Sequence, residues 1–184
     1  IYGKMQKLMQ EEGTSLEQLE EELKDKMKKL YLPQPDEKTG IIPQFDGYFD
    51  LKEIDLSVYK NASVVGTVFH DYSGEDVQGM QAGKQADIVE LLYQMEDITT
   101  PDNKAKNYVY YEARTLHDSS LSKAIHSITA CDLGMEKEAY DMFMSAALTD
   151  LGQEMKSSDA GIHSANMGGV WQDVVMGFGG IRIR

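Results

Sequence analysis

The chain has 184 residues, a length that predicts one domain or part of one. With 31 acidic against 18 basic side chains, its formal net charge of −13 argues against binding to a nucleic-acid backbone, which needs a basic face. Hydrophobic residues make up 41% of the chain, enough for a packed core, and no apolar run approaches the roughly 20 residues of a membrane-spanning helix.

The first 32 residues are predicted to contain an amphipathic helix. Thr14 and Ser15, followed by Glu17 and Gln18, are typical of a capping box, in which side chains satisfy the first free amides of a helix. The apolar stripe that follows covers about two heptads, too few for sustained pairing, so we expect the helix to pack against a core rather than in a coiled coil. The stripe consists of Leu16, Leu19, Leu23, Met27 and Leu30.

Residues 32–52 are predicted to form an ordered irregular loop. This stretch holds three of the four prolines of the chain, which end the preceding helix. It also holds Phe45, Tyr48 and Phe49, too many aromatic residues for a disordered linker. The short β-branched run at 64–69 fits either a strand or a buried helical turn, because periodicity does not separate the two in so short a run.

From Lys84 onward the pattern predicts helices. Apolar residues at 88, 91, 92 and 95 form the stripe of the first one. Pro101 is suited to the first turn of the second, which carries the tyrosine-rich run at 108–111.

Two further helices are predicted to form an αα-hairpin with a very short turn. Ser119 or Ser120 can cap the first of them, and Gly134 can end it. The second runs from Glu136 to about Leu151. The residues expected to point inward from the first helix are Leu121, Ile125 and Ile128.

Residues 157–184 are rich in glycine and poor in charge. Such a stretch is either a flexible tail or a tightly packed loop near a functional site. Large apolar residues lie between the glycines and favour the packed loop. The chain opens without an initiator methionine, and we expect it to be a segment of a longer protein.

The segment from Gly79 to Gln85 has some features of a nucleotide-binding loop but fails its requirements. Three residues instead of four separate its glycines, and Gln85 stands where a hydroxyl must hold magnesium. The cation and amide of Lys84 and Gln85, at a helix start, suit a hydroxyl-rich ligand. The alternative is a solvated helix terminus.

Two other segments have the composition of anion sites. Ser119 and Ser120 place two hydroxyls at a predicted helix N-terminus, where free amides and the helix dipole favour negative charge. The alternative is simple capping. His163, Ser164 and Asn166 stand in a glycine-rich stretch whose backbone can approach a ligand closely. Here the alternative is a turn with a buried, hydrogen-bonded histidine.

The sequence contains no recognisable metal or cofactor motif. Its four histidines form no HExxH or Cys/His cluster, and the acidic run at 71–76 lacks the EF-hand pattern. A Ser-His-Asp triad is poorly supported because no glycine-flanked nucleophile elbow is present. The single cysteine, Cys131, is expected in the core; it excludes a disulfide framework and indicates a reducing compartment, so we expect a cytoplasmic protein.

Four blocks, taken together, resemble glycoside hydrolase family 65, which includes maltose, kojibiose, nigerose and trehalose phosphorylases. They occur in the family's order and cover most of the chain from residue 33 onward. The blocks are Pro-Gln-Phe-Asp-Gly-Tyr-Phe at 43–49, Lys-Gln-Ala-Asp at 84–87, Tyr-Tyr-Glu-Ala-Arg-Thr-Leu-His-Asp-Ser-Ser-Leu-Ser at 110–122, and the run from Gly161-Ile162-His163 to Gly168-Gly169.

The resemblance implies an all-α fold, a portion of an (α/α)6 barrel in which helical hairpins surround a central pocket. Residues 1–184 would form the C-terminal portion of the barrel domain. The family's N-terminal β-sandwich and C-terminal β region would lie outside this chain.

The resemblance also implies an inverting phosphorylase, which cleaves an α-glucosidic disaccharide with inorganic phosphate to give β-glucose 1-phosphate and a free sugar. Phosphate then replaces the water, and the site needs hydrogen-bond donors where a hydrolase has its second carboxylate. No cofactor is expected. By matching position, Lys84 and Gln85 would hold the glucosyl unit. The phosphate candidates are Ser119, Ser120, His163 and Ser164, with Asn166 weaker.

The family's general acid is a glutamate on an earlier segment of the barrel, for which this chain offers no matching context. We do not assign that role to Glu112, so no catalytic residue is predicted here and the isolated chain should be inactive. Two alternatives remain: a hydrolase of the same family, such as an acid trehalase, and a non-catalytic helical carbohydrate-binding domain. The disaccharide linkage is open, and family members are commonly homodimers.

Overall fold

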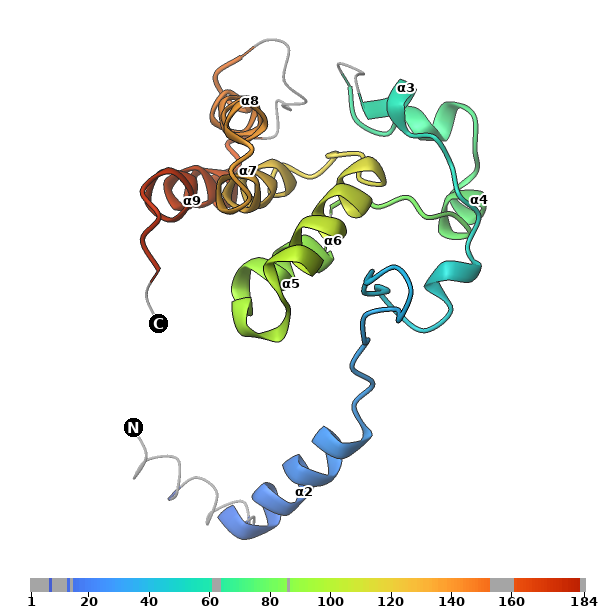
Figure 1. Ribbon diagram of the computed structural model, residues 1–184, viewed down its shortest axis with the longest axis vertical. Coiled ribbons are helices and arrows are strands. Elements are labelled where there is room, and N and C mark those ends of the chain that lie inside the picture. Colours follow the sequence, from blue (N-terminus) through green and yellow to red (C-terminus); the bar gives the residue numbers. More distant parts are fainter. Residues whose placement is uncertain are drawn as a thin grey trace. The chain divides into compact units, whose positions relative to one another are not determined.

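The computed structural model describes residues 7, 13, 15–60, 64–85, 87–152 and 161–182. The chain divides into two units, Ile1–Pro33 and Gln34–Arg184. Every element in the described ranges is helical (Figure 1). Within them, no helix combines the length and the apolar character needed to span a membrane.

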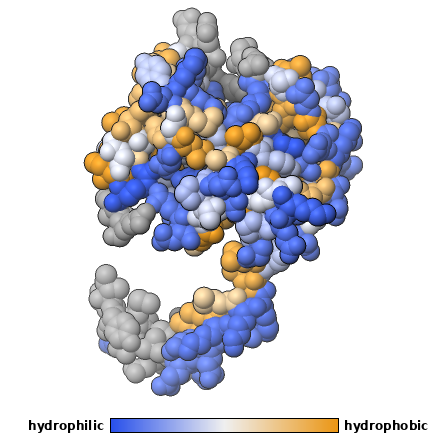
Figure 2. Space-filling view, viewed as in Figure 1, coloured by the Kyte–Doolittle hydropathy of each residue, from blue (hydrophilic) through white to orange (hydrophobic). Residues whose placement is uncertain are grey.

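The first unit contains helix α2 (Leu16–Lys29). Its predicted capping box is confirmed, because Ser15 and Gln18 exchange side-chain-to-backbone hydrogen bonds of 3.1 and 3.2 Å. Thr14 lies outside the described residues. In Figure 2 the apolar and polar residues of this helix lie on different sides.

Within its own unit, the described part of the apolar stripe of α2 is uncovered: Leu23 is 51% exposed and Met27 is 73% exposed. The packing of this stripe against a core stays a prediction. Periodicity fixes which side chains share a helix face, but it does not supply a partner for that face.

The first part of the second unit is irregular, as predicted for residues 32–52. Short helical turns interrupt it: η1 (Tyr48–Asp50), α3 (Ser57–Lys60), η2 (Thr67–His70) and α4 (Gly74–Gln78). The run at 64–69 leads into a helical turn, not a strand. Val68 is fully buried there, in a small cluster with Leu56 and Leu116.

Longer helices make up the rest of the second unit. They are α5 (Asp87–Gln94), η3 (Glu96–Ile98), α6 (Pro101–Ala113), α7 (Ser122–Asp132), α8 (Glu136–Ala147), α9 (Ser164–Gln172) and the π-helical turn η4 (Asp173–Phe178). Pro101 occupies the first turn of α6, as predicted. Helices α7 and α8 form the predicted hairpin, which Gly134 closes with a φ of 71°.

Three boundary predictions are wrong. Neither Ser119 nor Ser120 caps α7: the cap position is Leu121, which lacks a capping side chain and is 43% exposed rather than inward. Helix α8 ends at Ala147, and a turn carries the chain on to Leu151. The glycine-rich segment predicted as a packed loop is helical from 164 to 178, although 153–160 lie outside the described residues.

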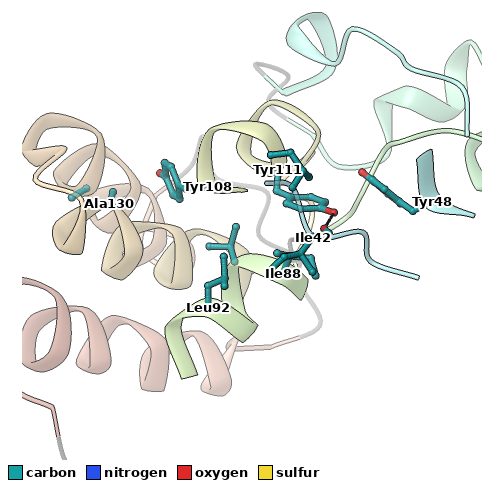
Figure 3. Packing of buried hydrophobic residues seen from close by; sticks show 10 residues of the cluster. Ile42, Tyr48, Ile88, Leu92, Tyr108, Tyr111 and Ala130 are labelled. Carbon is teal, nitrogen blue, oxygen red and sulfur yellow. Dashed lines mark hydrogen bonds between the residues drawn. The ribbon is translucent and has the colours of Figure 1, made fainter. Parts of the chain in front are cut away.

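The main core joins the irregular segment to α5, α6, α7 and α8 (Figure 3). Tyr111 on α6 packs beside Tyr48 and donates its hydroxyl hydrogen to the carbonyl of Ile42. Asn107, one turn earlier, accepts the Ile42 amide at 2.8 Å and donates to Gly40 at 2.9 Å. The irregular segment is therefore fixed to α6 by buried hydrogen bonds.

Helices α7 and α9 approach each other closely at Gly169. A Cβ atom added there would lie 2.9 Å from the Cβ of the buried Ala124, whereas a Cβ at Gly168 would meet nothing within 4 Å. We expect Gly169→Ala to lower the free energy of unfolding by about 1–3 kcal/mol through overpacking. Gly168→Ala, a matched control, should be neutral or stabilising by up to about 1 kcal/mol. Urea unfolding of both variants tests this, and equal stabilities would contradict it.

Candidate functional site

The predicted site residues lie at the starts of three helices. Lys84 and Gln85 come just before α5, Ser119 and Ser120 just before α7, and His163 directly before α9. Helix α7 packs against both α5 and α9, so the three helices that carry these residues form one packed group.

The loop before α5 and the loop before α7 are joined by backbone hydrogen bonds. The Gly83 amide donates to the carbonyl of Arg114 at 2.8 Å, and the Leu116 amide donates to the carbonyl of Gly83 at 2.8 Å. These two bonds form a short parallel bridge between Gly83 and Thr115. The loop carrying Lys84 is therefore held directly beside the loop that leads to Ser119.

Three of the five predicted phosphate residues meet at one small cavity. Ser119, Ser120 and His163 line a space of about 50 Å³, although more than 40 residues separate the serines from the histidine. The same cavity is lined by His117, Asp118, Lys123 and Thr149. The hydroxyls and the nearby ammonium of Lys123 supply hydrogen-bond donors suited to a small oxyanion.

Lys123 is a cavity residue that the sequence analysis missed. It lies in the first turn of α7, and its Nζ donates to the hydroxyl of Ser145 on α8. Nothing in the local sequence distinguishes it from an ordinary surface lysine.

Asp150 is a second missed residue, and it orients His163. Its Oδ1 accepts from Nδ1 of His163 at 2.6 Å, and its Oδ2 accepts from the His163 backbone amide at 2.8 Å. These hydrogen bonds lower the pKa of the Asp150 carboxyl, which stays ionised and fixes a proton on Nδ1. The ring nitrogen left for a ligand is therefore Nε2.

Ser164 and Asn166 are not among the residues that line this cavity. Ser164 is exposed at the start of α9. Asn166 is 3% exposed, and its Nδ2 donates to the carbonyl of Ala146 at 2.8 Å, which ties α9 to α8. Their assignment to phosphate stays a prediction.

Gln85 lines a second and larger cavity, of about 360 Å³. Other walls of this cavity come from the first turns of α7 and from the glycine pair of α9. Lys84 is exposed and is not among its lining residues. The described residues thus place one of the two sugar-binding candidates in a cavity.

His117 connects the small cavity to the protein interior. Its φ of 54° is left-handed, a conformation that costs a residue with a Cβ about 1–2 kcal/mol. The ring is 6% exposed, and its Nδ1 lies 3.0 Å from the Ser122 hydroxyl. Burial lowers the pKa of His117, and it lowers the pKa of the adjacent His126 to about 3, so both rings are neutral.

Among the described residues, no three His, Cys, Asp or Glu side chains are grouped in a way that could hold a metal ion. Cys131 is partly buried on α7, and burial raises the pKa of its thiol.

Comparisons with known proteins agree on one family. Residues 3–172 match the family model described as the glycosyl hydrolase family 65 central catalytic domain. A kojibiose phosphorylase from Halothermothrix orenii is 48% identical over 164 residues, which are 89% of this chain and 20% of that protein. An alpha,alpha-trehalose phosphorylase from Thermoanaerobacter brockii is 38% identical over 154 residues, 84% of this chain and 20% of that protein.

A solved structure agrees with the sequence matches. The structure named "Putative kojibiose phosphorylase from human microbiome" superimposes with a TM-score of 0.80 at 31% identity, and the match covers 97% of this chain and 26% of that one. This chain therefore spans about a fifth to a quarter of the length of the proteins that it matches.

Proposed function

The chain belongs to glycosyl hydrolase family 65, and from this membership we propose that it forms the latter part of the catalytic domain of an inverting disaccharide phosphorylase. Its helices are a portion of the (α/α)6 barrel of that enzyme family. The reaction would convert an α-glucosyl disaccharide and inorganic phosphate into β-glucose 1-phosphate and a free sugar.

The observation that carries this proposal is the meeting of Ser119, Ser120 and His163 at one small cavity beside Lys123. A hydrolase needs a carboxylate there to activate water, whereas a phosphorylase needs donors that hold an anion. The cavity does include Asp118, but Oδ2 of that carboxylate accepts the Gly66 amide at 3.0 Å. The serine hydroxyls and the Lys123 ammonium can donate to phosphate oxygens, whereas Nε2 of His163 accepts the hydrogen of a phosphate hydroxyl when the ring is neutral and donates only when the ring is protonated.

In the proposed reaction, a phosphate oxygen attacks the anomeric carbon on the face opposite the glycosidic oxygen. The bond to that oxygen breaks, its electron pair goes to the leaving sugar, and a general acid protonates it. The acid would be a glutamate on a segment outside this chain. Ser119, Ser120 and His163 would hold the phosphate in line, and Lys84 and Gln85 would hold the glucosyl unit.

The same proposal extends to the whole protein. Phosphate is a co-substrate, and no cofactor is needed. We propose a homodimer that works in the cytoplasm, on the basis of the family resemblance and the single cysteine.

Incubation of the full-length protein with maltose, kojibiose, nigerose or trehalose, with and without phosphate, tests the proposal. We expect glucose 1-phosphate from one of these disaccharides in the presence of phosphate and no glucose release in its absence. Equal release of glucose in both conditions would indicate a hydrolase and would overturn the phosphate assignments. No turnover of any disaccharide would favour a non-catalytic carbohydrate-binding domain.

A further inference from the structure

The loop that carries Ser119 and Ser120 begins at His117, whose backbone conformation is strained and whose ring contacts other side chains. His117 is the one non-glycine residue with a positive φ in the described ranges. Because the left-handed conformation is unfavourable for it, surrounding contacts must maintain that conformation. The groups that contact its ring therefore influence where the following two serines lie.

One of these groups is the carboxylate of Glu112, near the end of α6. Its Oε1 lies 3.6 Å from Nε2 of His117, which is longer than a hydrogen bond, and because that ring is neutral the contact is not an ion pair. The His117 ring, and then the ammonium of Lys60, hold the pKa of Glu112 down at about 2 despite its burial. The carboxylate is therefore ionised where it faces the His117 ring.

Lys60, from α3, fixes Glu112 in this position. Its Nζ donates to Oε1 of Glu112 at 2.5 Å and to the Glu112 backbone carbonyl at 2.6 Å. The Lys60 side chain is 18% exposed and that of Glu112 is 23% exposed, so water screens this ion pair weakly.

The next residue of the loop is tied to the same part of the chain. Asp118 accepts the amide of Gly66, six residues after Lys60, at 3.0 Å. His117 therefore faces Glu112 of α6, which Lys60 of α3 contacts, and the next residue, Asp118, accepts the amide of Gly66 directly. Neither Lys60 nor Glu112 lines the small cavity.

We propose that Lys60 and Glu112 are positioning residues of the phosphate subsite. Their partly buried ion pair holds His117 in its left-handed conformation, and so places the hydroxyls of Ser119 and Ser120 for phosphate. This inference rests on the proposed phosphorylase function. It assigns to the pair no contact with phosphate or sugar.

The test separates positioning from stability through single and double variants of the full-length protein. Lys60→Met or Glu112→Gln alone removes one partner and should lower Tm, because Lys60→Met leaves a buried carboxylate unpaired and Glu112→Gln a buried ammonium. The double variant contains neither charge, so its Tm should return toward that of the wild type. Its KM for phosphate should nevertheless stay raised by about tenfold or more, with KM for the disaccharide within about twofold.

A matched control is Glu53→Gln. Glu53 pairs with Arg114 at 3.0 Å, also at the end of α6, but its side chain is 71% exposed and it lies outside the small cavity. This variant should leave both KM values unchanged. If the double variant does not fold, Glu112→Asp, which keeps the charge but draws it back from His117, should also raise KM for phosphate.

Two results would overturn this inference and leave the proposed function intact. One is a double variant with the wild-type KM for phosphate, and the other is an equal rise in the KM for phosphate and the KM for the disaccharide. The wild-type protein decides the underlying function separately. If its turnover does not depend on phosphate, the proposed function fails and the inference fails with it.

Discussion

Replacing His163 by alanine in the full-length protein should raise KM for phosphate by about ten- to a hundredfold, the equivalent of one charge-assisted hydrogen bond of about 1.5–3 kcal/mol. The reason is the fixed state of the ring: Asp150 accepts from Nδ1, which leaves Nε2 to a ligand in the cavity that Ser119 and Ser120 also line. KM for the disaccharide should change little. Initial rates at varied phosphate and at varied disaccharide measure the two constants.

Two controls make this result specific. Lys84→Ala should show the opposite pattern, with weaker disaccharide binding, because Lys84 precedes α5 and is not among the residues of the small cavity. Ser164→Ala, next to His163, should raise KM for phosphate by less than about threefold, because an exposed hydroxyl forms only a weak, solvated contact with phosphate. A His163→Ala protein with the wild-type KM for phosphate would remove His163 from the subsite.

Elements governed by local chemistry could be predicted from the sequence. The capping box at Ser15, the proline at the start of α6 and the glycine after α7 each act within a few residues, and all three were confirmed. The prediction that a serine caps α7 failed for a tertiary reason. The left-handed backbone of His117, held by Glu112 and Ser122, sets the path of the loop, and the cap position falls on Leu121.

The candidate site could be predicted only in part. Family resemblance singled out Ser119, Ser120 and His163, which the fold brings to one cavity. Lys123 and Asp150 were missed because their roles depend on contacts with distant segments. Asp150 meets His163 across 13 residues, a pairing that no local spacing encodes.

A second large effect is expected at Asp173, the first residue of η4. This carboxyl is fully buried, and neither of its oxygens has a hydrogen-bond partner among the described residues. Burial raises its pKa to about 7, an effect that the nearby Ser127 hydroxyl partly offsets. The folded protein therefore keeps the proton on Asp173 over a pH range in which the unfolded chain loses it.

The direction of the pH dependence follows from the two pKa values. Below the unfolded-state pKa of about 3.9, Asp173 is protonated in both the folded and the unfolded state, and the free energy of unfolding carries no penalty from its ionisation. Between about pH 4 and 7 the unfolded chain releases the proton and the folded protein does not, so the free energy of unfolding falls as pH rises. Above about pH 7 the Asp173 carboxyl is ionised in both states, and the free energy of unfolding falls no further on account of this group.

Asp173→Asn removes the charge while nearly preserving the shape, so it should stabilise the protein most at alkaline pH. A shift from 3.9 to about 7 is roughly three units, or about 4 kcal/mol as an upper value, and relaxation around the charge brings the expected gain to about 2–4 kcal/mol. Urea unfolding of variant and wild type at about pH 4.5 and about pH 8 should show a difference that grows with pH.

The matched control is Asp141→Asn on α8, where the carboxylate is 59% exposed and pairs with Lys137 on the surface. Exposed ion pairs contribute at most about 1 kcal/mol, so its effect should be small at both pH values. Because the difference between variant and wild type cancels the other titrating groups, a gain at Asp173→Asn that does not change with pH would show that this carboxyl is not held protonated. A loss of stability at both pH values would show instead that its oxygens accept hydrogen bonds that an amide cannot replace.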